Sequence, residues 1–132
     1  MIQQKPKVIC DTGHNFAGIQ LIVEELKKES FQQLHIVFGM VNDKDVKSIL
    51  RLLPKTALYY FCEPSISRAL SSKIIFDEAI EMGLASQQYT TVQHAYEVAL
   101  DNAQPQDLIF VGGSTFVVAD LLAFIFKKNE KK

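Results

Sequence analysis

The sequence predicts an α/β fold, with a Rossmann-like, mostly parallel sheet of five or six strands and helices on both faces. Short apolar runs alternate along the chain with segments whose apolar residues recur at every third or fourth position. The runs at 35–39 and 107–111 are almost continuously apolar, which is typical of parallel strands buried on both faces. Such alternation implies parallel strands joined by helices that cross over the sheet.

The expected strands are the apolar runs that end in polar or glycine-containing turns. They lie at residues 8–11, 35–39, 57–62, 88–90 and 107–111, and the run at 88–90 is very short. Because parallel strands all point the same way, the turns that follow Asp11, Gly39, Cys62 and Val111 should share one edge of the sheet.

The expected helices follow these strands. The first begins at Phe16, and the others lie at about 46–53, 72–82, 92–103 and 115–127. Short polar side chains that can cap three of them are Asp43, Ser71 or Ser72, and Thr91. Pro54 cannot continue the second helix, and Gly83 ends the third.

The composition is that of one globular domain, with 132 residues, 48% apolar and 22% charged. A net charge of −1 gives no electrostatic footprint for nucleic acid or for an anionic membrane, so we expect neither as a partner. We expect the domain at 8–127, after a linker remnant at 1–7 and before a disordered tail at 128–132.

The cysteines and the most apolar stretch bear on the compartment. Cys10 and Cys62 both fall in apolar runs, so we expect free thiols in a reducing compartment rather than a disulfide. We expect no secretory signal or membrane span, since the stretch 116–126 is too short and contains Asp120. A cytoplasmic location follows. A helix that is apolar nearly all round must also be buried nearly all round, and we expect this domain itself to wrap the final helix.

The turn after the first strand carries the strongest candidates for chemistry, Asp11 and His14. A carboxylate at a strand end can accept hydrogen bonds from ribose or help orient a metal-bound phosphate, and an imidazole can donate to an anion or orient a nucleophile. The helix start at Phe16 adds free N–H groups that suit phosphate or carboxylate. A structural interpretation stays open beside this one: Asp11 would fix its own turn, and His14 would cap the helix.

The turn after the last strand, Gly112-Gly113-Ser114-Thr115, is the second candidate. Two glycines let a backbone approach a ligand closely, although an ordinary capped turn explains the same residues. Neither G-x-x-x-x-G-K-[ST] nor G-x-G-x-x-G occurs, so the chain has no phosphate-binding loop of its own.

Several other polar residues receive a structural interpretation. A capped, solvated helix start explains Asp43, Lys44 and Asp45, and a surface position is favoured for Arg68 even though it could reach an anion. The remaining histidines, His35 and His94, fit a strand start and a helix surface and have no metal-ligand partner at a useful spacing; we expect no metal site and no nucleophilic cysteine.

Four motifs, in order, resemble the C-terminal domain of folylpolyglutamate synthase / dihydrofolate synthase, in the Mur ligase superfamily. Asp11-Thr12-Gly13-His14-Asn15 is similar to D-G-A-H-N-P, and the stretch 38–45 is similar to G-M-x-x-D-K-D. The stretch 111–120 is similar to T-G-S-x-Y-x-V-G-E, and Ser67-Arg68-Ala69-Leu70 is similar to P-R-A-L. The resemblance covers about residues 7–126.

The resemblance implies an ATP-dependent ligase that joins L-glutamate to a folate or dihydropteroate carboxylate through an acyl phosphate. ATP and Mg²⁺ would be bound mainly by an N-terminal P-loop domain of the same protein. By matching position, Asp11 and Asn15 would bind the nucleotide, His14 would be catalytic and substrate-binding, and Ser114 and Phe116 would bind substrate.

The departures from the family pattern fall at Thr12, Gly13 and Phe16, which shape the backbone of the turn. The family's P-loop domain and linker arginine have no counterpart in this sequence, so we expect the chain alone to be inactive and to bind ATP weakly. The alternatives are a cell-wall precursor ligase domain, which the G-M-x-x-D-K-D similarity disfavours, and a stand-alone α/β nucleotide-binding or signalling module. A response-regulator receiver would need paired acids after the first strand and an acceptor Asp after the third, where this chain has Cys62-Glu63-Pro64.

Overall fold

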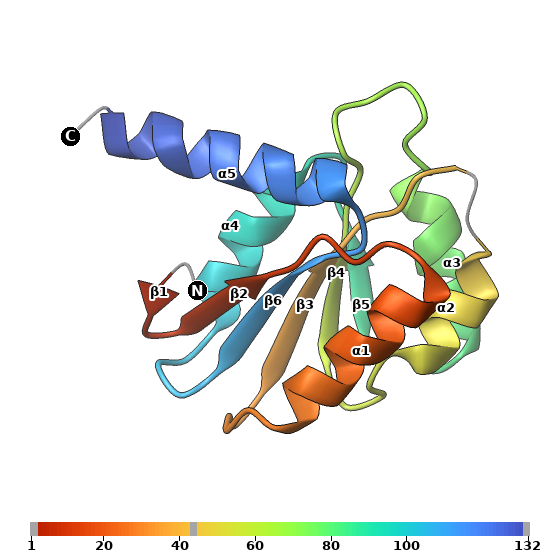
Figure 1. Ribbon diagram of the computed structural model, residues 1–132, viewed down its shortest axis with the longest axis horizontal. Helices are drawn as coiled ribbons and strands as arrows, with labels where there is room; N and C mark the ends of the chain where they lie inside the picture. Colours follow the sequence, from red (N-terminus) through yellow and green to blue (C-terminus); the bar gives the residue numbers. More distant parts are fainter. Residues whose placement is uncertain (1–2, 43–44, 131–132) are drawn as a thin grey trace.

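The computed structural model describes residues 3–42 and 45–130 of the chain. Six strands form one sheet in the order β1-β2-β6-β3-β4-β5. Five of these run parallel, and β1 pairs antiparallel with β2 (Figure 1). The strands are β1 (Gln3–Gln4), β2 (Lys7–Cys10), β3 (Leu34–Phe38), β4 (Leu58–Phe61), β5 (Ser86–Gln88) and β6 (Leu108–Gly112). The predicted α/β architecture is confirmed.

Five helices cover both faces of the sheet, as the alternating pattern predicted. They are α1 (Phe16–Lys27), α2 (Val46–Leu52), α3 (Ser72–Glu81), α4 (Val92–Asn102) and α5 (Thr115–Glu130). The helices α1, α2 and α3 pack on one face, and α4 and α5 pack on the other (Figure 1).

Alternate side chains of each central strand supply the two cores. In β6, Leu108 and Phe110 face α1, while Ile109 and Val111 face α4 and α5. This burial on both faces explains why the sequence of the strand is almost continuously apolar. Burying such side chains provides the main favourable free energy of the fold, at roughly 25 cal/mol per Å² of apolar surface.

Most predicted helix ends are confirmed, with one change at α2. The side chains of Ser71 and Thr91 accept hydrogen bonds from the Lys73 and His94 N–H groups. Gly83 follows the end of α3 with φ of +78°, a conformation that glycine adopts without strain. The cap of α2 is Asp45, and the expected cap Asp43 lies outside the described residues.

Three expectations about element ends are wrong. The short strand β5 is Ser86–Gln88 rather than 88–90, because its position is set by pairing with β4 and not by its own side chains. Within the expected linker remnant at 1–7, Gln3–Gln4 forms β1 and Lys7 begins β2. The tail expected from 128 is helical as far as Glu130, since α5 continues through its lysines.

The domain does not wrap α5, contrary to expectation. Only Val117, Val118 and Leu121 of this helix are buried, and Phe126 is 63% exposed. Phe124 and Ile125 are partly buried against the core on the α4 face of the sheet, and the C-terminal end of α5 runs out beyond α4 in Figure 1. Within the described residues, no helix combines the length and the apolar character that crossing a membrane requires.

Candidate active site

The turns after four parallel strands lie in one row at the carboxyl edge of the sheet. The Asp11 N–H donates to the Val111 carbonyl at 3.2 Å, and the Gly39 N–H donates to the Gly112 carbonyl at 3.3 Å. The Cys62 N–H donates to the Phe38 carbonyl at 2.9 Å. The ladder therefore continues past the strand ends and brings together turns that are far apart in sequence.

The connections at β6 make this part of the edge the best place for a ligand. The chain leaves β2 and β3 for helices on one face, whereas it leaves the intervening β6 for α5 on the other face. In open α/β sheets, ligands bind in the crevice between neighbouring strands whose connections diverge in this way. The turns at 11–15 and 112–116 flank that crevice.

Glycines allow these turns to lie against each other. A Cβ on Gly113, whose φ is +99°, would stand 2.3 Å from the Gly39 carbonyl oxygen. A Cβ on Gly39 would stand 2.7 Å from the Cys62 carbonyl oxygen. A close approach to a ligand was expected for Gly112 and Gly113; at Gly113 the structure shows a close approach to a neighbouring turn of the same protein.

Asp11 and His14 are both exposed at this edge. Oδ1 of Asp11 accepts a hydrogen bond from the Gly13 N–H at 2.8 Å, so this carboxylate does fix its own turn. Oδ2 has no hydrogen-bond partner among the described residues and can accept from a ligand. Nδ1 of His14 lies 3.3 Å from the Thr12 carbonyl oxygen, which leaves Nε2 without a partner in the described part of the chain.

The cap of α1 is Asn15, not His14. Its Oδ1 accepts a hydrogen bond from the Gly18 N–H at 2.8 Å. The structural interpretation of His14 as a helix cap is therefore wrong. The imidazole has no structural task beyond the weak contact with Thr12, whereas Asn15 uses its oxygen for the helix and keeps its amide group for another partner.

Ser114 is buried and caps α5. Its Oγ accepts a hydrogen bond from the Phe116 N–H at 3.0 Å, and the Phe116 ring is 38% exposed beside it. The N-termini of α1 and α5 both begin at this edge, so two positive dipole ends meet there. This arrangement suits an anionic ligand.

Arg68 is a further candidate at this edge, although the sequence favoured a plain surface position for it. It lies on the surface as expected, but its guanidinium carbon is 6.0 Å from the centre of the Phe116 ring. Its carbonyl accepts a hydrogen bond from the Asn42 N–H at 2.7 Å, which ties this residue to the turn after β3. The similarity of residues 67–70 to P-R-A-L was the one signal in the sequence that pointed to it.

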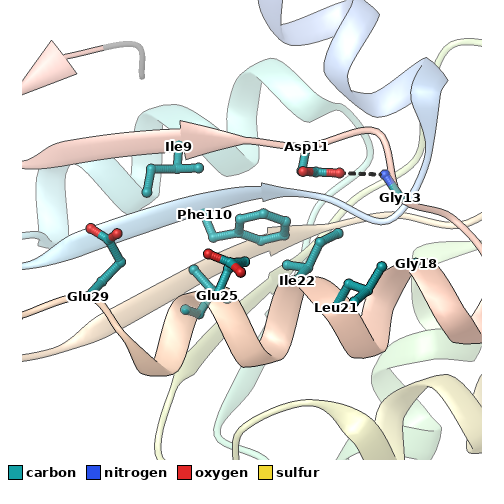
Figure 2. A pocket seen from close by; sticks show the side chains of 10 residues that line it. Ile9, Asp11, Gly13, Gly18, Leu21, Ile22, Glu25, Glu29 and Phe110 are labelled. Atoms are coloured by element: carbon teal, nitrogen blue, oxygen red, sulfur yellow. Dashed lines mark hydrogen bonds between the residues drawn. The ribbon is translucent and has the colours of Figure 1, made fainter.

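A hollow of about 240 Å³ opens between β2 and α1, beside Asp11 (Figure 2). Its lining is mainly apolar and includes Ile9, Ile22 and Phe110. Asp11 and Gly13 lie at one end of the hollow, and Glu25 and Glu29 border it on the α1 side (Figure 2). A flat, mainly apolar ring could lie in the hollow with its polar edge toward Asp11.

The two other histidines lie outside the turns at 11–15 and 112–116, which flank the crevice. His35 is buried at the opposite edge of the sheet, and His94 lies on the surface of α4. Both cysteines are free, and burial, followed by the charges of Asp120 and Glu63, raises the pKa of the Cys62 thiol. No group of three or more acidic, histidine or cysteine side chains able to hold a metal ion occurs among the described residues.

Comparison with known proteins identifies the family of this chain. A family model described as Mur ligase, glutamate ligase domain, matches residues 1–115. A probable bifunctional folylpolyglutamate synthase/dihydropteroate synthase of Haloferax volcanii is 31% identical over 123 residues, which are 88% of this chain and 14% of the relative.

Solved structures share the fold. The complex of E. coli FolC with DHPP and ADP gives a TM-score of 0.87 at 22% identity, over 96% of this chain and 30% of that one. A bifunctional folylpolyglutamate synthase/dihydrofolate synthase with Mn, AMPPNP and L-glutamate bound gives 0.85 at 25% identity, over 94% and 30%. The chain therefore spans less than a third of the length of each of these proteins.

Proposed function

Because the chain belongs to the Mur ligase family of glutamate ligase domains, we propose that it is the C-terminal domain of an ATP-dependent ligase. This ligase would add L-glutamate to a folate or dihydropteroate carboxylate through an acyl phosphate. The observation that carries the proposal is that the turn of Asp11 and His14, the start of α5 and the loop of Arg68 all lie at the carboxyl edge of the sheet, where two helices also begin. The names of its relatives support the choice of substrates.

The residues at this edge fit a nucleotide. The unpartnered oxygen of Asp11 can accept hydrogen bonds from ribose hydroxyls, the adjacent hollow is apolar enough for a flat ring, and the Asn15 amide can donate to an oxygen. The described residues offer no metal cluster, so Mg²⁺ would be held mainly by a P-loop domain elsewhere in the protein. ATP would supply the phosphoryl group that activates the substrate carboxylate.

His14 would handle the proton of the incoming amine. An amino group that attacks an acyl phosphate must lose a proton, and a neutral imidazole can accept one near physiological pH. With Nδ1 directed at the Thr12 carbonyl, Nε2 is the nitrogen free to do so. The exposure of the ring leaves it accessible to substrate.

The carboxylates of L-glutamate would be recognised by Arg68 and by the start of α5. A planar guanidinium matches a carboxylate with two parallel hydrogen bonds, and the guanidinium carbon of Arg68 lies 6.0 Å from the centre of the Phe116 ring. Ser114 would contribute by orienting the first turn of α5, whose N–H groups favour an anion.

The test compares this chain with the full-length protein that contains it. The full-length protein should convert dihydropteroate or a reduced folate, L-glutamate and ATP into amide, ADP and phosphate, whereas the 132-residue chain alone should show no turnover and weak ATP binding. Assaying a cell-wall precursor in parallel separates the two ligase classes. Robust turnover by the chain alone would contradict the proposal.

A further inference from the structure

Two short hydrogen bonds join α5 to the loop 63–70, which carries Arg68. The Ser65 N–H donates to Oδ2 of Asp120 at 2.7 Å, and the Ser65 hydroxyl donates to Oδ1 at 2.7 Å. Both oxygens of one carboxylate are thus committed to one residue, 55 positions earlier in the chain. Bonds to a charged acceptor are stronger than neutral ones, and two of them fix both distance and orientation. We call this contact the Ser65–Asp120 pair.

The rest of the loop is tied to other elements, which gives the pair a distinct task. Oε2 of Glu63 accepts from the Ser72 N–H at 3.0 Å and so joins the start of the loop to α3. At its far end, the Leu70 N–H donates to the Met40 carbonyl at 2.9 Å and joins it to the turn after β3. Among these contacts, the Ser65–Asp120 pair is the one that holds the loop against α5, the helix of Phe116.

The backbone of Arg68 is anchored on two sides. Its own carbonyl accepts a hydrogen bond from the Asn42 N–H at 2.7 Å, on the side of the turn after β3, and the Ser65–Asp120 pair holds the loop on the side of α5. No carboxylate of a described residue lies within ion-pair distance of the guanidinium, and the ring contact at 6.0 Å is weak for an exposed pair. A long, flexible side chain is therefore not fixed by its own interactions. Its location relative to Phe116 follows from where the loop backbone stands against α5.

We propose that Asp120 and Ser65 are positioning residues that set Arg68 over Phe116 and thereby determine how well the edge binds its anionic amino-acid substrate. The proposal rests on the proposed function. The pair borders an open hollow of about 280 Å³ that Thr91, Gln93 and Lys127 also line, so water competes for these hydrogen bonds. A contact of this kind adds little to global stability, and its effect should be local.

The kinetic test uses the full-length ligase. Asp120→Ala should raise the KM for L-glutamate roughly tenfold, because a small displacement of a binding group is costly. Its kcat, its KM for ATP and its Tm should stay close to wild type. Asp120→Asn and Ser65→Ala should have smaller effects, since each keeps one hydrogen bond. In the Asp120→Ala background, Ser65→Ala should add nothing. Asp101→Ala, on the surface of α4, and Ser67→Ala, in the same loop, are the matched controls.

Hydrogen exchange on the same proteins separates positioning from folding. In Asp120→Ala the amides of 64–70 should exchange faster, while those of β6 keep their wild-type protection. An unchanged KM and loop exchange would overturn the proposal, as would a lower Tm with faster exchange throughout the domain. If Asp120→Ala does not fold, the KM for L-glutamate, the Tm and the hydrogen exchange of Asp120→Asn are measured instead and decide between the same outcomes. A wild-type protein without glutamate ligation would refute the proposed function, whereas the loop exchange would still report on the pair.

Discussion

Each end of the sheet holds a histidine beside an aspartate, and the two pairs are built in opposite ways. At the carboxyl edge, the side chains of Asp11 and His14 are exposed, and among the described residues they form hydrogen bonds only within their own turn. At the amino edge, His35 and Asp107 are buried, come from segments 72 residues apart, and meet at 2.9 Å between Nε2 and Oδ2.

Both ring nitrogens of the amino-edge histidine have partners. Nδ1 of His35 lies 2.8 Å from the Tyr60 hydroxyl, which also accepts a hydrogen bond from the Asn102 amide at 3.3 Å. Oδ2 of Asp107 accepts from the Gln104 N–H at 3.0 Å as well. Burial and the occupation of both ring nitrogens, not residue type, distinguish a structural histidine from one available for chemistry.

Replacing the exposed histidine should give the largest effect. In the full-length ligase, His14→Ala should lower kcat roughly 10²–10⁴-fold, the range that a general base contributes, without changing Tm. Steady-state assays and a thermal melt check both parts. His94→Ala, on the surface of α4, is the matched control and should keep wild-type turnover. Full activity of His14→Ala would contradict the claim that the exposed histidine is the one available for chemistry.

Replacing the buried acid should instead reduce stability. Asp107→Ala leaves the His35 ring without its partner, so the free energy of unfolding should fall by about 3 kcal/mol. Urea unfolding measures it, with Asp101→Ala as the exposed control. The kcat of the folded variant should be unchanged. A loss no greater than that of the control would show that the buried network is not structural.

Lowering the pH should also show that the buried Asp107 contributes to stability. Burial by itself would raise the pKa of Asp107, but hydrogen bonds from the Gln104 N–H and from His35 outweigh it and hold the pKa below its ordinary value. Unfolding therefore takes up a proton as the pH falls. The stability from this carboxylate is complete above its ordinary pKa of about 4 and is lost as the pH falls through the folded-state pKa.

Urea midpoints measured from pH 6 to pH 3 should consequently fall less steeply in Asp107→Ala than in wild type. Some slope should remain, because hydrogen bonds from the Ser48 hydroxyl and N–H also lower the pKa of Asp45. Parallel curves for the two proteins would contradict the assignment.

The smallest predicted effect is a difference between two serine residues that cap helices. Ser114 and Ser71 cap α5 and α3 through similar hydrogen bonds, of 3.0 and 3.2 Å. Replacing either by alanine should cost about 1 kcal/mol of unfolding free energy. Only Ser114→Ala should also raise the KM for L-glutamate, because α5 starts beside the site. An equal KM in both variants would reduce Ser114 to a structural residue.

The sequence predicted those parts of the fold that depend on local pattern. Apolar periodicity located the helices, and the caps at Ser71 and Thr91 follow from short polar side chains that bond to nearby N–H groups. It misplaced β5, whose Ser86 and Gln87 are strand residues only because they pair with Tyr59 and Tyr60. The prediction that this domain buries α5 was also wrong, because an apolar composition does not reveal whether a neighbouring element covers a helix.

The candidate site likewise has a part that the sequence predicted and a part that it did not. That the turns after β2 and β6 meet at one edge follows from parallel strands, and the motif at 11–15 could be found on that ground. The place of Arg68 could not, because its loop is held by long-range contacts: the Asn42 N–H donates to the Arg68 carbonyl, and Ser65 donates to Asp120, 55 residues away. The roles given to Asp11, His14, Asn15, Ser114 and Phe116 remain predictions for the experiments above.

The most direct measurement is amide hydrogen exchange of the full-length protein with and without AMPPNP and L-glutamate. The account predicts slower exchange in the segments 11–16, 64–70 and 113–117 at the carboxyl edge, and no change in 30–34 and 103–107 at the amino edge. Protection confined to the amino edge, or absent from both, would contradict the claim that the carboxyl edge forms half of an active centre.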